Sequence, residues 1–204
     1  AFIHIPKTAG STLRAILRRS FGPRHCDLRP WAFQRKSHGW LCADDLRFAQ
    51  RIYPRLDGIS GHRVNCFSGL EQAADLRFFT WVRDPVARFV SLFLYSKRRR
   101  LEHCTREEMM TFCADPFHRN QQTLWLSGTD RAAAAVEMLE KRIGFVGMME
   151  VFDESLVLLQ RWLAHPALVI TYARRNAGRG RVAWPLLDDP ELRGLIEAAN
   201  REDQ

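Results

Sequence analysis

The chain has 204 residues, of which 46% are hydrophobic, and it carries a formal net charge of +8 at pH 7. This length suits one domain with an ample core, and no apolar run approaches the roughly 18 residues that a membrane-spanning helix needs. The positive balance, carried mostly by arginine, predicts binding to anions such as nucleotides, polyanionic glycans, nucleic acid or acidic membranes. A GC-rich genome explains the arginine bias equally well.

The first twelve residues, AFIHIPKTAGST, predict a strand, a tight loop and the N-terminus of a helix. A helix N-terminus presents unpaired backbone N–H groups and the positive end of its dipole, which together suit an anion. Lys7 adds a full charge, and we expect Ser11 and Thr12 to cap the helix or donate to phosphate oxygens. The alternative is a capped helix with Lys7 in solvent. A Walker A motif is excluded, because its Lys follows the second Gly.

The rest of the chain alternates short apolar strands with helices. After the first helix, which is expected to end near 21–23, helices are expected at 44–53, 68–74, 84–99, 105–114, 120–126, 130–142, 153–163 and 191–201. Strands are expected at 58–62, 77–83, 143–148 and 168–171, and long loops at 24–40 and 172–184. Asp84 is the expected N-cap of one helix, and Thr105 with Glu108 forms a capping box at another. This alternation predicts an α/β fold, a three-layer sandwich with a mostly parallel central sheet.

We expect residues 1–204 to form a single domain, with 101–142 as a helical insertion or lobe. The chain starts without Met and within an expected strand, so we expect that it is truncated at both ends. The five cysteines include no CxxC pair, which argues against a zinc site, and no cluster of metal ligands is visible. We therefore expect free thiols in a reducing compartment. The cysteines are Cys26, Cys42, Cys66, Cys104 and Cys113.

Three expected strand ends carry polar side chains: Lys7 after the first, His62 after the second and Arg83 after the third. If the strands are parallel, these groups converge at one edge of the sheet, where ligands of such folds bind. Arg88, Ser91 and Tyr95 are spaced to lie on one face of the following helix. Arg83 and Ser91 can then hold one anionic group while the first loop holds another, which indicates a ligand with phosphates at two positions.

The stretches HIPKTAGST and FTWVRDPVARFVSLFLY closely resemble the two nucleotide motifs of the sulfotransferase superfamily, nearest to the branch of uronosyl 2-O-sulfotransferases and their bacterial relatives. The first resembles the 5′-phosphosulfate loop, and R-D-P-x-x-R-x-x-S resembles the 3′-phosphate motif. Weaker similarities follow at 61–63, 120–128 and 145–163. Because the two motifs occur in order, about 75 residues apart, they form a specific signal. The resemblance implies a P-loop-NTPase-like fold.

The resemblance also implies an enzyme that transfers a sulfuryl group from 3′-phosphoadenosine 5′-phosphosulfate (PAPS), leaves 3′-phosphoadenosine 5′-phosphate (PAP) and needs no metal. Lys7 would stabilise the leaving phosphate, and Arg83 with Ser91 would hold the 3′-phosphate. Arg179 or Arg181 would touch the 3′-phosphate from a segment that covers the nucleotide, although the family's Asn-x-Ser/Thr is here replaced by residues 176–178. The 5′-phosphate would be held by the loop residues Pro6, Lys7, Thr8, Ala9, Gly10, Ser11 and Thr12.

The base that takes the acceptor proton is expected to be His62, because imidazole titrates near neutral pH. A similar His follows the second strand in the uronosyl branch. His38, in the long loop, is the alternative base. The other reading of His62 is a histidine that only packs, and His4 is expected to point into the sheet.

The acceptor is expected to be a hydroxyl on a carbohydrate, by the branch resemblance alone. Two other functions stay open: a P-loop-like nucleotide kinase, and a non-catalytic module that binds polyanions. No nucleic-acid-binding motif is present. The basic run 97–100 is either solvated or guides a polyanionic acceptor, and Trp31, Phe33 and Trp40 either stack on a ligand or belong to the core. The expected location is the bacterial cytoplasm, or the Golgi lumen if a eukaryotic N-terminal anchor is missing.

Overall fold

The computed structural model describes residues 1–28, 39–97, 104–173 and 188–204, and an all-parallel β-sheet lies at its centre. In these ranges five strands pair in the order β2-β3-β1-β4-β5. Ile3 of β1 lies level with Gly61 of β3 on one side and with Thr80 of β4 on the other. The strands are β1 (Phe2–Ile3), β2 (His25–Asp27), β3 (Gly58–Gly61), β4 (Phe78–Val82) and β5 (Ile143–Met148).

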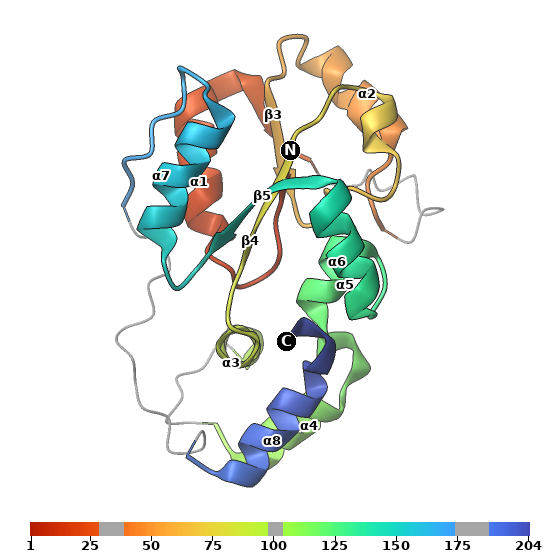
Figure 1. Ribbon diagram of the computed structural model, residues 1–204, viewed down its shortest axis with the longest axis vertical. Coiled ribbons are helices and arrows are strands. Elements are labelled where there is room, and N and C mark those ends of the chain that lie inside the picture. Colours follow the sequence, from red (N-terminus) through yellow and green to blue (C-terminus); the bar gives the residue numbers. More distant parts are fainter. Residues whose placement is uncertain (29–38, 98–103, 174–187) are drawn as a thin grey trace.

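Helices cover both faces of this sheet (Figure 1). One face carries α1 (Gly10–Phe21) and α7 (Phe152–Leu163). The other carries α2 (Ala43–Ile52), α5 (Gln121–Ser127) and α6 (Ala132–Lys141). The predicted three-layer α/β fold is therefore confirmed.

The strand order places a ligand-binding position between β1 and β4. The chain leaves β1 toward β2 on one side of the sheet and leaves β4 toward β5 on the other. In open parallel sheets, ligands bind outside the carboxyl ends of the strands where the strand order reverses in this way. The loops that follow β1 and β4 carry Lys7 and Arg83.

Alternating side chains of the strands supply both cores. Phe79 and Trp81 of β4 pack among apolar residues of α1 and α7, whereas Phe78 packs on the opposite face with residues of α2, α5 and α6. Successive residues of a strand point to opposite faces, and a strand buried on both faces reads as a continuous apolar run. This is why residues 77–83 could be recognised as a strand.

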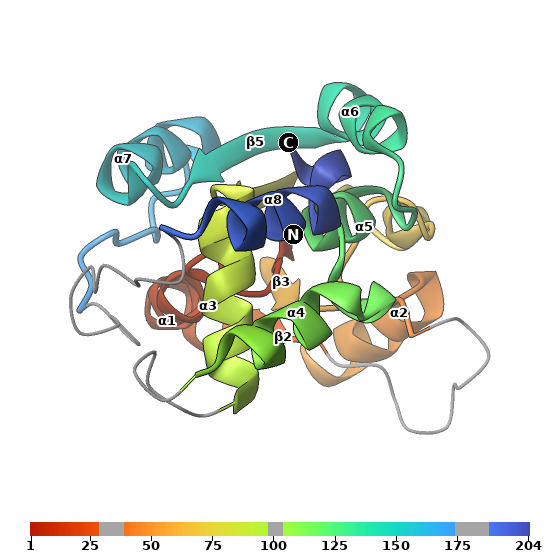
Figure 2. The same cartoon turned by 90° about the horizontal axis from the view of Figure 1, so that it is seen from below.

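A third helical group lies beyond the carboxyl ends of the strands and consists of α3 (Pro85–Lys97), α4 (Arg106–Ala114) and α8 (Pro190–Ala199). Figure 2 shows these three helices in front of the sheet. They share a cluster that includes Phe89, Phe93 and Leu192. Asp84 accepts a hydrogen bond from the Ala87 N–H (2.8 Å), and Thr105 with Glu108 forms the expected capping box of α4.

Two local expectations are wrong, and a third, the short helical piece at 68–74, is present but shorter than expected. Residues 168–171 form no strand, and the Val169 N–H donates instead to Ser20 Oγ (2.9 Å), a side chain where a strand partner was expected. The expected long loop 24–40 contains the edge strand β2, which is too short to show a hydrophobic period. The helix expected at 68–74 is a single 3₁₀ turn over Leu70–Gln72. No helix in the described ranges combines the length and the apolar character that crossing a bilayer requires.

Candidate nucleotide and acceptor site

The loop between β1 and α1 holds two residues in the left-handed backbone region. Lys7 has φ 71° and Ala9 has φ 64°, which for residues with a Cβ costs about 1–2 kcal/mol each. Helix α1 begins at Gly10, with Ala9 as its N-cap, and no side chain caps this end. The expectation that Ser11 or Thr12 caps the helix is therefore wrong, because both lie inside its first turn. The backbone N–H groups of this turn can bind an anion instead.

Contacts with buried residues hold this loop in place. Thr8 is fully buried, and its hydroxyl donates to the carbonyl oxygen of Ile5 (3.0 Å). At Gly10, a Cβ would lie 1.9 Å from Cδ2 and Nε2 of the His4 ring. Gly10 is thus required by close packing on a histidine rather than by its own backbone angles.

The two sequence motifs meet at Lys7 and Arg83, which are 76 residues apart. Arg83 donates from Nη1 to the Lys7 carbonyl oxygen (3.3 Å). Burial lowers the pKa of Lys7, and the charge of Arg83 lowers it further; burial likewise lowers the pKa of Arg83, although Glu150 and Asp84 oppose this. The Lys7 ammonium lies 4.3 Å from the ring centre of Tyr95, and no carboxylate among the described residues pairs with it. Two half-buried cations side by side form an electropositive position that an anion would stabilise.

The backbone after β4 is held by two residues whose roles the sequence analysis missed. Gln122 of α5 accepts from the Arg83 N–H and donates to the Arg83 carbonyl oxygen, both at 2.9 Å. Glu150 accepts from the Asp84 N–H (2.8 Å). The family similarity at 120–128 indicated that Gln122 could matter, but the similarity did not show that Gln122 would hold the Arg83 backbone. Ser91 lies on α3, half-buried, two helical turns after this segment.

His62 directly follows β3, the neighbour of β1, and its ring is fixed by His4. The His62 Nδ1 lies 2.9 Å from the His4 carbonyl oxygen. A carbonyl oxygen only accepts, so Nδ1 carries the proton and Nε2 is the basic nitrogen of the neutral ring. The two imidazole rings stack, with centres 3.9 Å apart and planes 26° from parallel. The expectation that His4 lies within the sheet region agrees with its exposure of only 4%.

A buried polar cluster lies at the end of β2, near His4. Arg14 of α1 donates to both carboxylate oxygens of Asp27, at 2.8 and 2.7 Å. Burial opposes the charge of Asp27, but hydrogen bonds from three neighbours outweigh it and hold the pKa of Asp27 well below its ordinary value. These neighbours are His25, Arg14 and Ser60. No sequence pattern indicated this cluster, because β2 was not expected.

Other expected site residues lie elsewhere. Arg88 does not share an open helix face with Ser91 and Tyr95; it is fully buried, whereas Tyr95 is 70% exposed. Trp40 packs edge-on against Trp125 and Phe67, so it belongs to the core cluster. Five candidates fall outside the described residues. They are the alternative base His38, the aromatic pair Trp31 and Phe33, and the two arginines Arg179 and Arg181.

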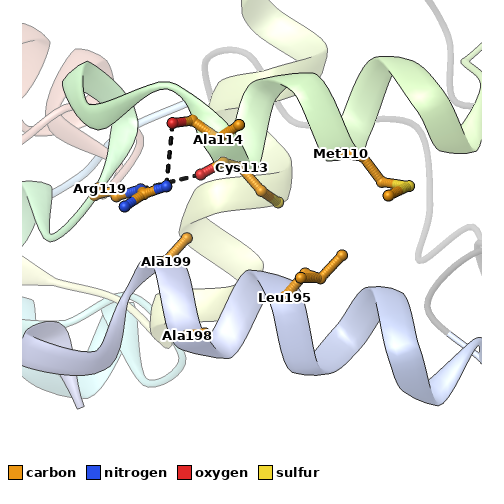
Figure 3. A pocket seen from close by; sticks show the side chains of 7 residues that line it. All are labelled: Met110, Cys113, Ala114, Arg119, Leu195, Ala198 and Ala199. Carbon is orange, nitrogen blue, oxygen red and sulfur yellow. Dashed lines mark hydrogen bonds between the residues drawn. The ribbon is translucent and has the colours of Figure 1, made fainter.

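A pocket of about 340 Å³ lies between α4 and α8 (Figure 3). Its apolar walls include Met110 and Leu195, and its one charged lining residue, Arg119, donates to the carbonyl oxygens of Cys113 and Ala114. Burial raises the pKa of the lining thiol Cys113 to about 11, which keeps it protonated at neutral pH, so we place the candidate site at the sheet edge. In the described ranges, no three His, Cys, Asp or Glu side chains gather as metal ligands do.

Comparisons with known proteins show the family of the chain. Galactose-3-O-sulfotransferase 3 of Mus musculus is 28% identical over 208 residues, which is 87% of this chain but only 47% of that protein. The crystal structure of a sulfotransferase from Alicyclobacillus acidocaldarius aligns over 97% of this chain and 93% of its own, at 15% identity and a TM-score of 0.46. The model of the sulfotransferase family matches residues 1–183, and the chain therefore belongs to the sulfotransferase family.

Proposed function

We propose that this protein transfers a sulfuryl group from PAPS to a hydroxyl group of a carbohydrate. The observation that carries the proposal is the hydrogen bond from Arg83 to the Lys7 carbonyl oxygen. It joins the two motifs at one edge of the sheet, where burial lowers the pKa of both cations and no described carboxylate neutralises Lys7. Such a position favours a ligand with more than one anionic group.

The residues of the site fit this donor. The first turn of α1 offers N–H groups that no side chain caps, and Gly10 lets this turn pack closely on the His4 ring. Thr8 would act through its backbone N–H, because its hydroxyl is bound to Ile5. The 5′-phosphate would be held by Pro6, Lys7, Thr8, Ala9, Gly10, Ser11 and Thr12, and the 3′-phosphate by Arg83 and Ser91. Arg179 and Arg181, outside the described residues, remain candidates for the same phosphate.

PAPS would supply the sulfuryl group, and the protein would supply position and charge. Lys7 would stabilise the negative charge that grows on the bridging oxygen as the bond to sulfur breaks. His62 would accept the acceptor proton at Nε2, since its Nδ1 donates to His4. Neither role requires a redox change or a covalent intermediate on the protein.

A carbohydrate acceptor is supported by the name of the mouse relative, a galactose 3-O-sulfotransferase. The chain spans about half the length of that relative, so its substrate is a starting point for a search. Lactose, which ends in galactose, is a suitable first acceptor, with phenols and amines as the comparison set.

Titration calorimetry tests the donor directly. We expect the protein to bind PAP in the absence of Mg²⁺ and more tightly than ATP. Lys7→Ala should weaken PAP binding roughly 10- to 100-fold, the effect of losing one charge-assisted hydrogen bond. Lys141→Ala is the matched control: it removes the same charge from an exposed lysine that pairs with Glu137 (2.9 Å), and it should leave PAP binding unchanged.

Two results would reject the proposal. Mg²⁺-dependent preference for ATP would point to a nucleotide kinase. Equal losses of PAP affinity in the Lys7 and Lys141 variants would indicate a general polyanion-binding surface. Transfer of labelled sulfate from PAPS to lactose, lost in His62→Ala, then tests the acceptor and the base together.

A further inference from the structure

His4 lies between the loop that we assign to the donor and the base that we assign to the acceptor. Only 4% of its surface is exposed. One part of its ring packs so closely on Gly10 that a Cβ there would be 1.9 Å away. Its ring face stacks on His62 at 3.9 Å, and its backbone carbonyl oxygen accepts the hydrogen bond from His62 Nδ1. One buried residue therefore contacts both halves of the site.

We infer that His4 is a positioning residue, whose ring holds His62 in the orientation that keeps its proton on Nδ1 and couples that orientation to the donor loop through Gly10. This inference rests on the proposed role of His62 as the base. Two contacts act on the same imidazole: the carbonyl oxygen selects the tautomer, and the stacked ring restricts rotation out of the plane in which that hydrogen bond forms.

The surroundings of His4 keep it neutral. Burial, followed by the charges of His62 and Arg14, lowers the pKa of His4 to about 3, although Asp27 opposes this. Arg14 is itself paired with Asp27. The Phe2 ring also stacks on the His4 ring, with the two ring centres 5.5 Å apart. When His62 accepts a proton, its new charge faces the π-system of a neutral ring and not a second cation, an arrangement that favours the imidazolium.

A protonated His4 would repel the charge of a protonated His62, whereas a neutral His4 does not. Its pKa of about 3 lies far below the pH at which histidine bases work, so His4 stays neutral at neutral pH. With so low a pKa, the neutral His4 ring is a poor base and a poor acid at neutral pH. It acts through His62 and the loop.

The first test compares His4→Phe, which keeps a ring, with His4→Leu, which does not. Nitrogen-15 NMR of the imidazole ring reads the tautomer of His62 without any acceptor. We expect the Nδ1–H form in the wild type and in His4→Phe, and a mixture with the Nε2–H form in His4→Leu. An Nε2–H form in the wild type, or an unchanged Nδ1–H form in His4→Leu, would overturn the inference. Should His4→Leu fail to fold, the wild type and His4→Phe still decide.

Turnover of PAPS with lactose gives the second readout. We expect kcat to fall roughly 10- to 100-fold in His4→Leu and to recover most of this loss in His4→Phe, as expected for a misplaced base. PAP affinity should change less than about 3-fold in both variants, which corresponds to under 1 kcal/mol. Equal losses of kcat in the two variants would contradict a role for the stacked ring. If lactose is not sulfated at all, the acceptor assignment fails, and the NMR result still tests His4.

The coupling through Gly10 is tested by a pair of compensating changes. Gly10→Ala should abolish PAP binding, because its Cβ overlaps the His4 ring. His4→Ala combined with Gly10→Ala removes this overlap and should restore PAP binding, while kcat stays low because the stacked ring is gone. Failure of the double variant to bind PAP more tightly than Gly10→Ala would show that His4 is not the contact that restricts position 10.

Discussion

Arg83 and Arg88 lie five residues apart in one motif, but their surroundings are opposite. Arg83 is half-buried beside Lys7 and donates to a backbone carbonyl oxygen. Arg88 is fully buried, and it donates to Gln121 and Asn200 at 3.0 Å each and lies 3.8 Å from Asp203. Burial lowers the pKa of both, that of Arg88 to about 10, with Asp203 opposing the shift.

The difference separates a charge that the fold holds in place from charges that we propose bind a ligand. The hydrogen-bond and ion-pair partners of Arg88 are polar side chains of the fold, and the carboxylate of Asp203 also accepts from the N–H groups of Gln122 and Thr123 at the start of α5. Around Arg83 and Lys7 the positive charges are adjacent and the backbone is strained. Removing one partner of a buried ion pair destabilises a fold, whereas adjacent like charges are typical of a position for a ligand.

The largest expected effect is the loss of stability in Arg88→Met. It leaves Asp203 as a buried charge without its cation, which costs about 3–5 kcal/mol. Urea denaturation measures this loss. The matched control is Arg83→Met, which removes the same charge from the site and should change the free energy of unfolding by less than about 1 kcal/mol. Equal destabilisation by the two changes would remove the distinction between the two arginines.

The next effect concerns catalysis without stability. Lys7→Met should lower kcat roughly 100- to 1,000-fold, the usual consequence of losing a group that stabilises transition-state charge. Its stability should be equal to or higher than that of the wild type. The pKa of Lys7 is lowered in the fold, so its charge disfavours folding at pH values below that pKa, and this penalty disappears as pH rises toward the ordinary 10.5.

Unfolding curves at several pH values check the sign. The stability advantage of Lys7→Met should narrow as the pH rises into the alkaline range. An advantage that grows with pH would contradict the lowered pKa of Lys7. Lys141→Met is the opposite control on an exposed helix surface, because a hydrogen bond to Glu137 raises the pKa of Lys141.

Much of this arrangement was predictable from sequence, and the limits have physical causes. The apolar run 77–83 and the Asp84 cap located β4 and α3, and the parallel sheet then required Lys7 and Arg83 to meet. Helical spacing also placed Arg88 near Ser91 and Tyr95. It could not show that α5 and the C-terminal turn cover one end of that face, because those contacts span 33 and 112 residues.

The neighbouring residues Gln121 and Gln122 sharpen the comparison further, since one holds Arg88 and the other holds Arg83. Each change to Met should cost about 1–3 kcal/mol, because each leaves buried polar groups unpaired. Only Gln122→Met should weaken PAP binding, by about 10-fold, through loosening of the Arg83 backbone. Calorimetry measures the PAP affinity of the two variants. A matching loss of affinity in Gln121→Met would show that the site depends on the whole polar network.

The smallest expected effect is at Tyr95, the exposed ring beside Lys7. A cation–π contact at an exposed position contributes about 0.5–1 kcal/mol, so Tyr95→Leu should weaken PAP binding only 2- to 5-fold. Tyr95→Phe keeps the ring and should bind as the wild type does. The effect should vanish in a Lys7→Met background, because no ammonium remains for the ring to hold. A loss that persists there would place Tyr95 in direct contact with the nucleotide, and the ring would then belong to the binding site itself and not to the support of Lys7.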